Sequence, residues 1–333
     1  MKNSSYVVLV LFVGALFFTA CSTKEVYEPK VVSGKWKKYA PMESEIVDRS
    51  LNAALLENQK VLSANGELNV SIPENQRIIS LSDGWVLSAS IDGNLTLTSE
   101  SDSSVKKEFM LKNTIASASV KDDMLAVMFA DDEIALYDIP SKALLFKEQG
   151  GKSIASDMRI VNPYFMKGLV IFATLDGKVV IVSTSMKKKL RTVIISSADY
   201  FNNVIDLHLL GNKIIAATDT KMLSLTKKEL RQKYEIRNIA YGENEIYITT
   251  KQGEVIALTP DLQVISKVKF PFAHFLGLIN KGDKLYALEK EGYLITIDKK
   301  SFDYKVEEVD IDDGFVFTGK DLFYVNDKEI LIN

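Results

Sequence analysis

Few residues of this chain have the types and spacing that catalysis or metal binding requires. His208 (in VIDLHLLG) and His274 (in FPFAHFLG) lie far apart in apolar stretches, with no further metal ligand at a recognisable spacing. Neither a nucleophile elbow nor a phosphate-binding loop occurs in the sequence. The aspartates cluster at Asp122-Asp123, Asp131-Asp132 and Asp310, Asp312 and Asp313, but no cluster has the full pattern of a calcium loop, so we interpret them as turn residues. The sequence therefore predicts a protein that is not an enzyme, with no catalytic residue, metal site or cofactor.

The single cysteine, Cys21, indicates chemistry of another kind. It follows Lys2, an apolar run from Tyr6 to Phe18 and the small residues Thr19 and Ala20, which is the order of a secretory signal and is too short for a spanning helix. A lone thiol offers an exported chain no internal disulfide. One alternative is an ordinary signal followed by an incidental thiol.

The stretch from Phe18 to Cys21 resembles a bacterial lipobox, although Phe18 replaces the usual leucine. The resemblance implies that the Cys21 sulfur carries a diacylglyceryl group with acyl chains such as palmitate. Ser22, where inner-membrane lipoproteins commonly have aspartate, implies sorting to the outer membrane. We therefore expect a signal peptide over residues 1–20, a lipidated flexible tether over 21–32, and a protein held at the outer membrane that faces the periplasm.

Two sets of polar residues are candidate surface sites. Asn69 and Asn94 each begin an Asn-x-Ser/Thr triplet with an acid two residues earlier, which resembles the extended bacterial glycosylation sequon; alternatively, both acids occupy one repeat position at a turn. The second set is a basic run of four residues, Lys187, Lys188, Lys189 and Arg191. The run could bind an acidic partner or anionic lipid headgroups; alternatively, it is the solvated edge of an outer strand. The net charge of −3 at pH 7 does not favour nucleic acid as a partner.

The elements that would carry these residues form an internal repeat. Eight stretches consist of an apolar run, a short turn and a second apolar run, which is a hairpin pattern. Their turns centre on Gly66, Gly93, Asp132, Gly177, Thr220, Gly253, Gly292 and Lys320. The mean spacing of about 36 residues is close to the ~40 of a four-stranded propeller blade. The first and last steps are short, which leaves seven blades as an alternative to eight.

The apolar character of these hairpins indicates strands buried on both faces, while the weaker amphipathic segments between them, such as KKEFML, read as outer strands. We therefore predict an all-β fold: a single β-propeller over residues 33–333, with eight blades of four-stranded antiparallel sheets. Because little sequence follows the eighth hairpin, the N-terminal KVVSGKWKKYA is expected to close the last blade. In SEIVDRSLNAALLEN, Val47, Leu51, Ala54 and Leu55 have helical spacing, so a short helix competes there with a strand.

The repeats resemble those of the quinoprotein-like (PQQ-like repeat) propellers, most clearly in EIALYDI from Glu133, EVIAL from Glu254 and YLITID from Tyr293. The Thr-Gly pair of that family is largely replaced, as at Ser141-Lys142, and the blade tryptophan is absent. A quinone-dependent dehydrogenase would need an adjacent cysteine pair and a tryptophan floor, but the chain has one cysteine and only Trp36 and Trp85.

With a lipid anchor, the repeats look like the BamB family of the β-barrel assembly machinery. That resemblance implies a noncatalytic scaffold, monomeric within a complex, that contacts envelope proteins including the barrel-forming outer-membrane subunit. The alternatives are an accessory scaffold of a secretion or motility machine, a quinoprotein-like enzyme and a glycan-binding propeller. Aromatic residues such as Tyr200-Phe201 and Phe270, Phe272 and Phe275 could line a ligand groove or belong to the core.

Overall fold

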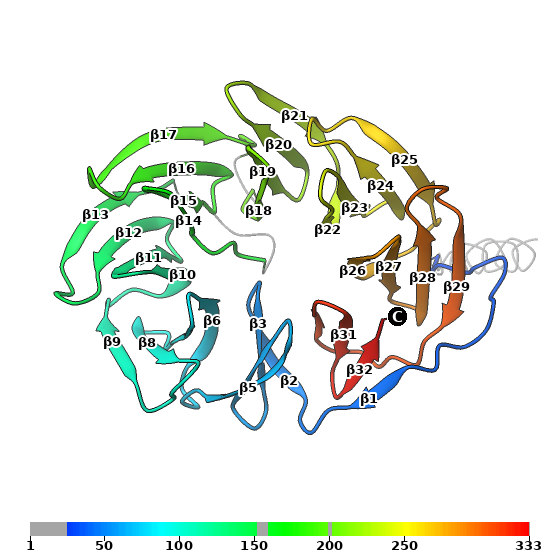
Figure 1. Ribbon diagram of the computed structural model, residues 1–333, viewed down its shortest axis with the longest axis horizontal. Coiled ribbons are helices and arrows are strands. Elements are labelled where there is room, and N and C mark those ends of the chain that lie inside the picture. The colour runs from blue at the N-terminus through cyan, green and yellow to red at the C-terminus, as the bar shows by residue number, and fades with distance from the viewer. Residues whose placement is uncertain (1–24, 152–158, 199–201, 333) are drawn as a thin grey trace, which may run out of the picture.

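The computed structural model describes residues 25–151, 159–198 and 202–332. The signal peptide predicted over residues 1–20, Cys21, and the aromatic pair Tyr200-Phe201 lie outside these ranges. Within them the chain is all-β, with eight four-stranded antiparallel sheets arranged around a common centre (Figure 1). The eight-bladed β-propeller predicted from the repeat is confirmed. Nowhere in these ranges is there a helix long and apolar enough to cross a membrane.

The strands follow the chain blade by blade, from the inner edge of the ring outward. Blades one to four consist of β2 (Ile46–Arg49), β3 (Ala53–Leu56), β4 (Lys60–Ser63) and β5 (Gly66–Ser71); β6 (Arg77–Ser82), β7 (Trp85–Ala89), β8 (Asn94–Ser99) and β9 (Lys106–Met110); β10 (Ile115–Lys121), β11 (Met124–Phe129), β12 (Glu133–Asp138) and β13 (Leu144–Gln149); and β14 (Tyr164–Met166), β15 (Leu169–Ala173), β16 (Lys178–Ser183) and β17 (Lys188–Ile194).

The remaining blades repeat this order, except that the eighth is built from both ends of the chain. Blades five to eight consist of β18 (Val204–Leu210), β19 (Lys213–Thr218), β20 (Lys221–Leu225) and β21 (Glu229–Lys233); β22 (Ile236–Tyr241), β23 (Ile246–Thr250), β24 (Glu254–Leu258) and β25 (Val264–Lys269); β26 (Phe275–Lys281), β27 (Lys284–Glu289), β28 (Tyr293–Asp298) and β29 (Tyr304–Glu308); and β30 (Val316–Thr318), β31 (Leu322–Val325) and β32 (Lys328–Leu331) with β1 (Tyr39–Pro41) outermost.

The hydrophobic core lies between the blades. The middle strands are buried on both faces, as in β3, where all four residues are buried, because each sheet packs between two neighbours. The outer strand β21 is exposed along its whole length. Continuous apolar runs in the middle strands and charged outer strands are the pattern that such packing requires.

The ring is closed as predicted. Strand β1 pairs antiparallel with β32, with Tyr39 opposite Ile330, so the N-terminal segment supplies the outer strand of the last blade (Figure 1). The buried Trp36 donates from its indole nitrogen to the Leu331 carbonyl at 3.2 Å. The pairing satisfies backbone groups that would otherwise form an open sheet edge.

The structure decides two points of the repeat that the sequence leaves open. The segment SEIVDRSLNAALLEN forms strands β2 and β3, so the strand alternative holds, because Ala54 and Leu55 are needed in the core between blades. The hairpins at Gly66 and Lys320 join β4 to β5 and β30 to β31, whereas the other six join the second and third strands of a blade. The short first and last steps therefore come from hairpins that are one strand out of phase, and the seven-blade alternative is wrong.

Candidate functional site

The innermost strands share an irregularity that shapes the centre of the ring. In six blades the register shifts near the start of the first strand, so that one extra residue lies opposite the second strand. The extra residues are Val47, Ile79, Ala116, Ile205, Arg237 and Leu276. Bulges of this kind redirect side chains and increase the local twist. The bulges thus place a selected residue from each of several blades at the central channel.

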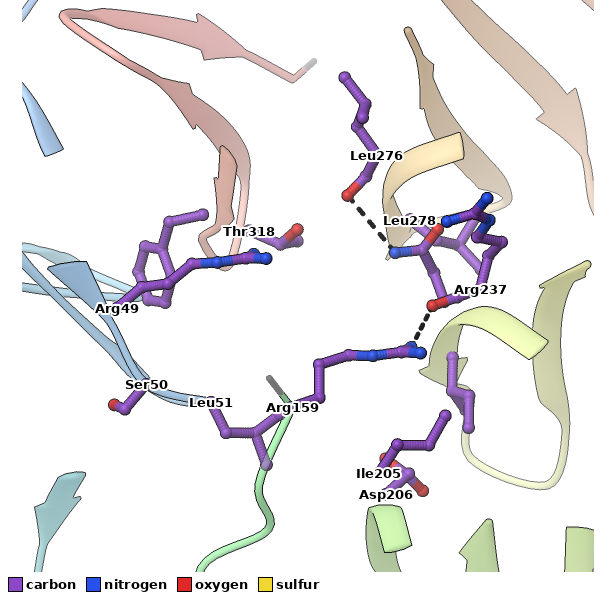
Figure 2. Close-up of a pocket in the computed structure, with 13 residues that line it drawn as sticks. Arg49, Ser50, Leu51, Arg159, Ile205, Asp206, Arg237, Leu276, Leu278 and Thr318 are labelled. Atoms are coloured by element: carbon purple, nitrogen blue, oxygen red, sulfur yellow. Dashed lines mark hydrogen bonds between the residues drawn. The ribbon is translucent and has the colours of Figure 1, made fainter. Parts of the chain in front are cut away.

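A cavity of about 210 Å³ lies in the channel and is the candidate functional site (Figure 2). Its walls come from blades one, five, six, seven and eight and from the segment before β14. Three bulge residues line it, Ile205, Arg237 and Leu276. The other lining residues are Arg49, Ser50, Leu51, Arg159, Asp206, Asn238, Ile239, Leu278, Phe317 and Thr318.

Two of the three arginines of the cavity also tie the ring together. Arg49 donates to the Val316 carbonyl at 2.7 Å, which connects blade one to blade eight. Arg159 donates to the Arg237 carbonyl, as the dashed line in Figure 2 shows. Because a guanidinium carries five donors in a fixed plane, it suits carboxylate or phosphate groups as well as backbone carbonyls.

The single carboxylate of the cavity lining, Asp206, is held by the next blade. The Tyr241 hydroxyl donates a hydrogen bond to it, and the His208 ring stacks on Tyr241 with centroids 3.8 Å apart. Burial raises the pKa of Asp206 to about 6, against the opposing effects of Tyr241 and the Arg159 charge. Desolvation lowers the pKa of His208, so this histidine is a neutral packing partner at pH 7.

The chemistry that this lining offers is recognition of polar or anionic groups. Among the residues that the structure describes, no three His, Cys, Asp or Glu side chains gather where they could hold a metal ion. The cavity combines three guanidinium groups and one carboxyl with the apolar side chains of Leu51, Ile239 and Leu278.

One of the predicted turn aspartates has a second role. Asp132 has a positive φ of 66° at the β11–β12 turn, and it is fully buried and accepts a hydrogen bond from the Leu175 amide of blade four at 2.7 Å. Burial, reinforced by the nearby Asp176 carboxyl, raises the pKa of Asp132 to about 7. Glycine occupies the corresponding turn position with positive φ at Gly93, Gly177, Gly253 and Gly292.

The two candidate glycosylation residues lie far from the channel, on exposed surface. Asn69 is in the outer strand β5, and Asn94 begins β8, the third strand of its blade. The acids before them therefore do not share a repeat position, because the Gly66 hairpin is one strand out of phase. Glu67 pairs with Lys60 at 2.5 Å, whereas Asp92 lies in the β7–β8 turn. Whether Asn69 and Asn94 carry glycans stays a prediction.

The predicted basic run lies on the outer rim of blade four. Lys188, Lys189 and Arg191 belong to β17, and Lys187 lies in the turn before it with a φ of 54°. Lys189 pairs with Glu148 of β13 at 2.6 Å, and Arg191 pairs with Glu229 of β21, so the run bridges three neighbouring blades. A role for Lys187, Lys188, Lys189 and Arg191 in partner binding stays a prediction.

The channel arginines were not among the residues singled out from the sequence, although a signal for their position exists. In five inner strands the bulged residue follows Ile or Val and precedes Asp, Ser or Asn, as in Ile46-Val47-Asp48 and Ile236-Arg237-Asn238. Alignment of these strands with one another, in place of the hairpins alone, would have identified the bulge and its neighbours.

Comparisons with known proteins agree on the fold and include a sequence relative. No family model matches the chain. The plasminogen-binding protein PgbB, from two strains of Helicobacter pylori, is 28% identical to 89% of this chain. The chain spans only 63% of the length of these relatives.

The similar solved structures are propellers of diverse origin. BamB from Moraxella catarrhalis has a TM-score of 0.65 with 10% identity, and the match covers 87% of this chain and 96% of BamB. The C-terminal WD40 domain of Sif2 has the same TM-score of 0.65 with 11% identity, covering 90% and 98% of the two chains. A computationally designed protein, Ika8, has a TM-score of 0.63 with 12% identity, covering 91% and 98%. At such identities the likeness shows the β-propeller fold, and function needs other evidence.

Proposed function

We propose that this chain is a noncatalytic, protein-binding β-propeller, held at the outer membrane by lipid on Cys21 and facing the periplasm. The observation that carries the binding role is the 28% identity, over 89% of the chain, to a protein named for binding another protein. A rigid ring with long exposed outer strands is suited to present surfaces to large partners. The arrangement of the channel supports the noncatalytic part, since its carboxyl group is engaged by Tyr241, and Arg49 and Arg159 donate to backbone carbonyls.

The first candidate partner is the barrel-assembly machinery of the outer membrane. It is supported by the predicted lipid anchor and by the likeness to the BamB fold. The test is crosslinking of the lipidated protein in envelope membranes, followed by identification of the captured proteins by mass spectrometry. Recovery of the barrel-forming subunit, and its loss with Cys21→Ala, is expected. Recovery of a secretion or motility machine without that subunit would replace this partner and keep the scaffold.

The second candidate partner is plasminogen, which is favoured by the sequence relative. The test is binding of the purified chain to immobilised plasminogen, measured by surface plasmon resonance. The double variant Lys187→Gln/Lys188→Gln should weaken the binding if the basic run makes the contact, and it leaves the pairs of Lys189 and Arg191 intact. The matched control is Lys227→Gln/Lys228→Gln, at an exposed basic turn of blade five. Absence of binding by the unaltered chain would reject this partner.

A further inference from the structure

We propose that the rim formed by Val26, Phe272 and Tyr304 lies against the bilayer surface, so that the ring has a fixed orientation on the membrane. This inference rests on the lipid anchor of the proposed function and adds the face by which the ring meets the lipid. The chemistry of the partner is that of a phospholipid interface, which takes up aromatic and aliphatic side chains.

The N-terminal segment is bound to the ring well before its first strand. Tyr27 is only 5% exposed and packs edge-to-face on Phe270 and Tyr293, with ring centroids 6.0 and 5.6 Å away. From there the chain follows β29, where the Ser33 amide donates to Val306 and the Trp36 amide to Glu308, both at 2.8 Å. Figure 1 shows this blue segment passing along the outer side of β29 towards β1. The ring is therefore attached to the chain that leads to Cys21 at one place, beside blades six and seven.

The distance from this attachment to the lipid is short. Only residues 22–26 separate Cys21 from Tyr27, and six residue steps of extended chain reach at most about 20 Å. That reach is less than the width of a small domain. The surface around Tyr27 is thus the part of the ring that must lie near the membrane when Cys21 is lipidated.

The same surface exposes apolar side chains. Val26, Phe272 and Tyr304 are 42%, 58% and 53% exposed and line one groove together with the Tyr27 segment. Lys30 and Lys269 lie in the same lining, beside Glu25 and Glu28, and their ammonium groups can reach lipid phosphates. Aromatic residues with flanking lysines are typical of surfaces that rest at a membrane interface.

The backbone at Phe272 is a second, independent observation. Phe272 has a φ of +66° in the turn from Phe270 to Ala273. A hydrogen bond from the Ala273 amide to the Phe270 carbonyl, at 3.1 Å, closes this turn. With Pro271 before it, this is the position of a type II turn that glycine or asparagine fills with least strain. Leu262 and Phe302 also have positive φ, but they are 1% and 9% exposed, so packing in the core explains them. Phe272 gains little burial within the chain, which points to a partner outside it.

Tryptophan fluorescence in vesicles tests the contact. The full lipidated chain with Phe272→Trp is reconstituted in phosphatidylethanolamine and phosphatidylglycerol vesicles that contain a brominated acyl chain. Emission at position 272, taken as the difference from the unaltered protein, is expected to shift to shorter wavelength and to be quenched by the bromine. The matched control is Met110→Trp, because Met110 is 75% exposed on the outer strand of blade two. Position 110 is expected to show neither effect.

The possible outcomes test the lipid contact of the rim and the lipid anchor at Cys21 separately. Failure of the unaltered protein to float with the vesicles would reject the anchor and the rim together. Flotation without quenching at 272, or with equal quenching at 272 and 110, would reject the rim alone and leave the anchor. A shift to shorter wavelength without quenching would show that protein covers Phe272, which also overturns the lipid contact.

A stability measurement tests whether Phe272 contacts lipid or instead stabilises the fold. Phe272→Asn should leave the unfolding temperature unchanged or raise it, because asparagine tolerates positive φ and little burial is lost. Phe302→Asn, in the same backbone conformation but buried, should lower the unfolding temperature. An equal fall for Phe272→Asn would show that Phe272 serves the fold, and the inference would be wrong.

Discussion

The inner and outer strands of neighbouring blades are joined by different kinds of contact. Between the inner strands, Ser80 of β6 donates from its hydroxyl to the Ala118 carbonyl of β10 at 2.6 Å, and Ser80 is fully buried. Between the outer strands, Lys189 and Glu148 form an ion pair in which the side chains are 42% and 32% exposed. Water screens the second kind of contact and not the first. The comparison indicates that the ring is held together at its centre and that substitutions on its outer surface cost little stability.

The largest effect is expected where the inner strands of blades seven and eight touch. A Cβ on Gly277 would meet the Phe323 ring at 2.7 Å and the Thr318 hydroxyl at 2.8 Å, and Phe323 is fully buried. Gly277→Val should therefore cost about 3 kcal/mol, because overpacking shifts a rigid neighbour. Urea denaturation measures the loss. Gly282→Asn is the control, since Gly282 has open space around its Cβ and a φ of +55°, and it should be nearly neutral. Equal stability of Gly277→Val and the unaltered chain would contradict tight contact at the centre.

The second prediction uses the buried carboxyl between blades three and four. Because the pKa of Asp132 is raised to about 7 in the folded state, the folded chain binds the proton more tightly than the unfolded chain. This group therefore lowers stability as pH rises from about 4 to about 7, and the loss is complete above that range. Asp132→Asn keeps an acceptor for the Leu175 amide and should be more stable than the unaltered chain at pH 8 by about 1–3 kcal/mol.

The measurement for Asp132 is the difference in unfolding free energy between the two chains at pH 5, 6, 7 and 8. Asp206, whose pKa is raised to about 6, titrates in the same window in both chains, so its contribution cancels in the difference. A difference that stays constant from pH 5 to 8 would show that Asp132 does not carry the pH dependence.

The sequence predicts the repeat and the closing strand because both depend on patterns that every blade obeys. Middle strands must be apolar on both faces, and an open sheet edge must be paired, so eight blades and the role of the N-terminal segment follow. The phase of the Gly66 and Lys320 hairpins does not follow, because a first-and-second or third-and-fourth strand pair has the same local pattern as the middle pair. The bulges do not follow from the local pattern either.

The candidate site and the other functional candidates differ in how far the sequence reveals them. Asp132 reads as a turn residue, and its turn is confirmed, but its burial depends on Leu175 of another blade. The channel arginines come from blade one, blade six and the segment before β14, and only the closed ring brings them to one cavity. Tyr27 lies in a stretch of mixed charge with no periodicity, so nothing in its local sequence indicates that it packs on Phe270.

The third prediction concerns a single contact at the centre. Ser80→Ala removes the donor to the Ala118 carbonyl and leaves that acceptor buried, which should cost about 1–2 kcal/mol. The effect on the urea midpoint should be independent of salt, since both partners are uncharged. Ser82→Ala is the comparison: from a partly buried position, the Ser82 hydroxyl donates to the Val120 carbonyl and accepts from the Val120 amide, both at 2.9 Å, and water can replace both contacts. A larger loss for Ser82→Ala than for Ser80→Ala would contradict the view that burial sets the strength.

The smallest effect is expected at the ion pair between the outer strands of blades three and four. Lys189→Gln breaks the pair with Glu148 and should change the unfolding free energy by at most about 0.5 kcal/mol, because both side chains are partly exposed and long. The change should shrink further in added salt, which screens exposed charges. If Lys189→Gln cost as much stability as Ser80→Ala, the outer strands would help to hold the ring closed. Their charges could then not vary without loss of the fold. If the cost is small, as expected, the same substitution can report on partner binding without disturbing the ring. Contacts at the centre then maintain the ring, and those between the outer strands can vary without loss of the fold.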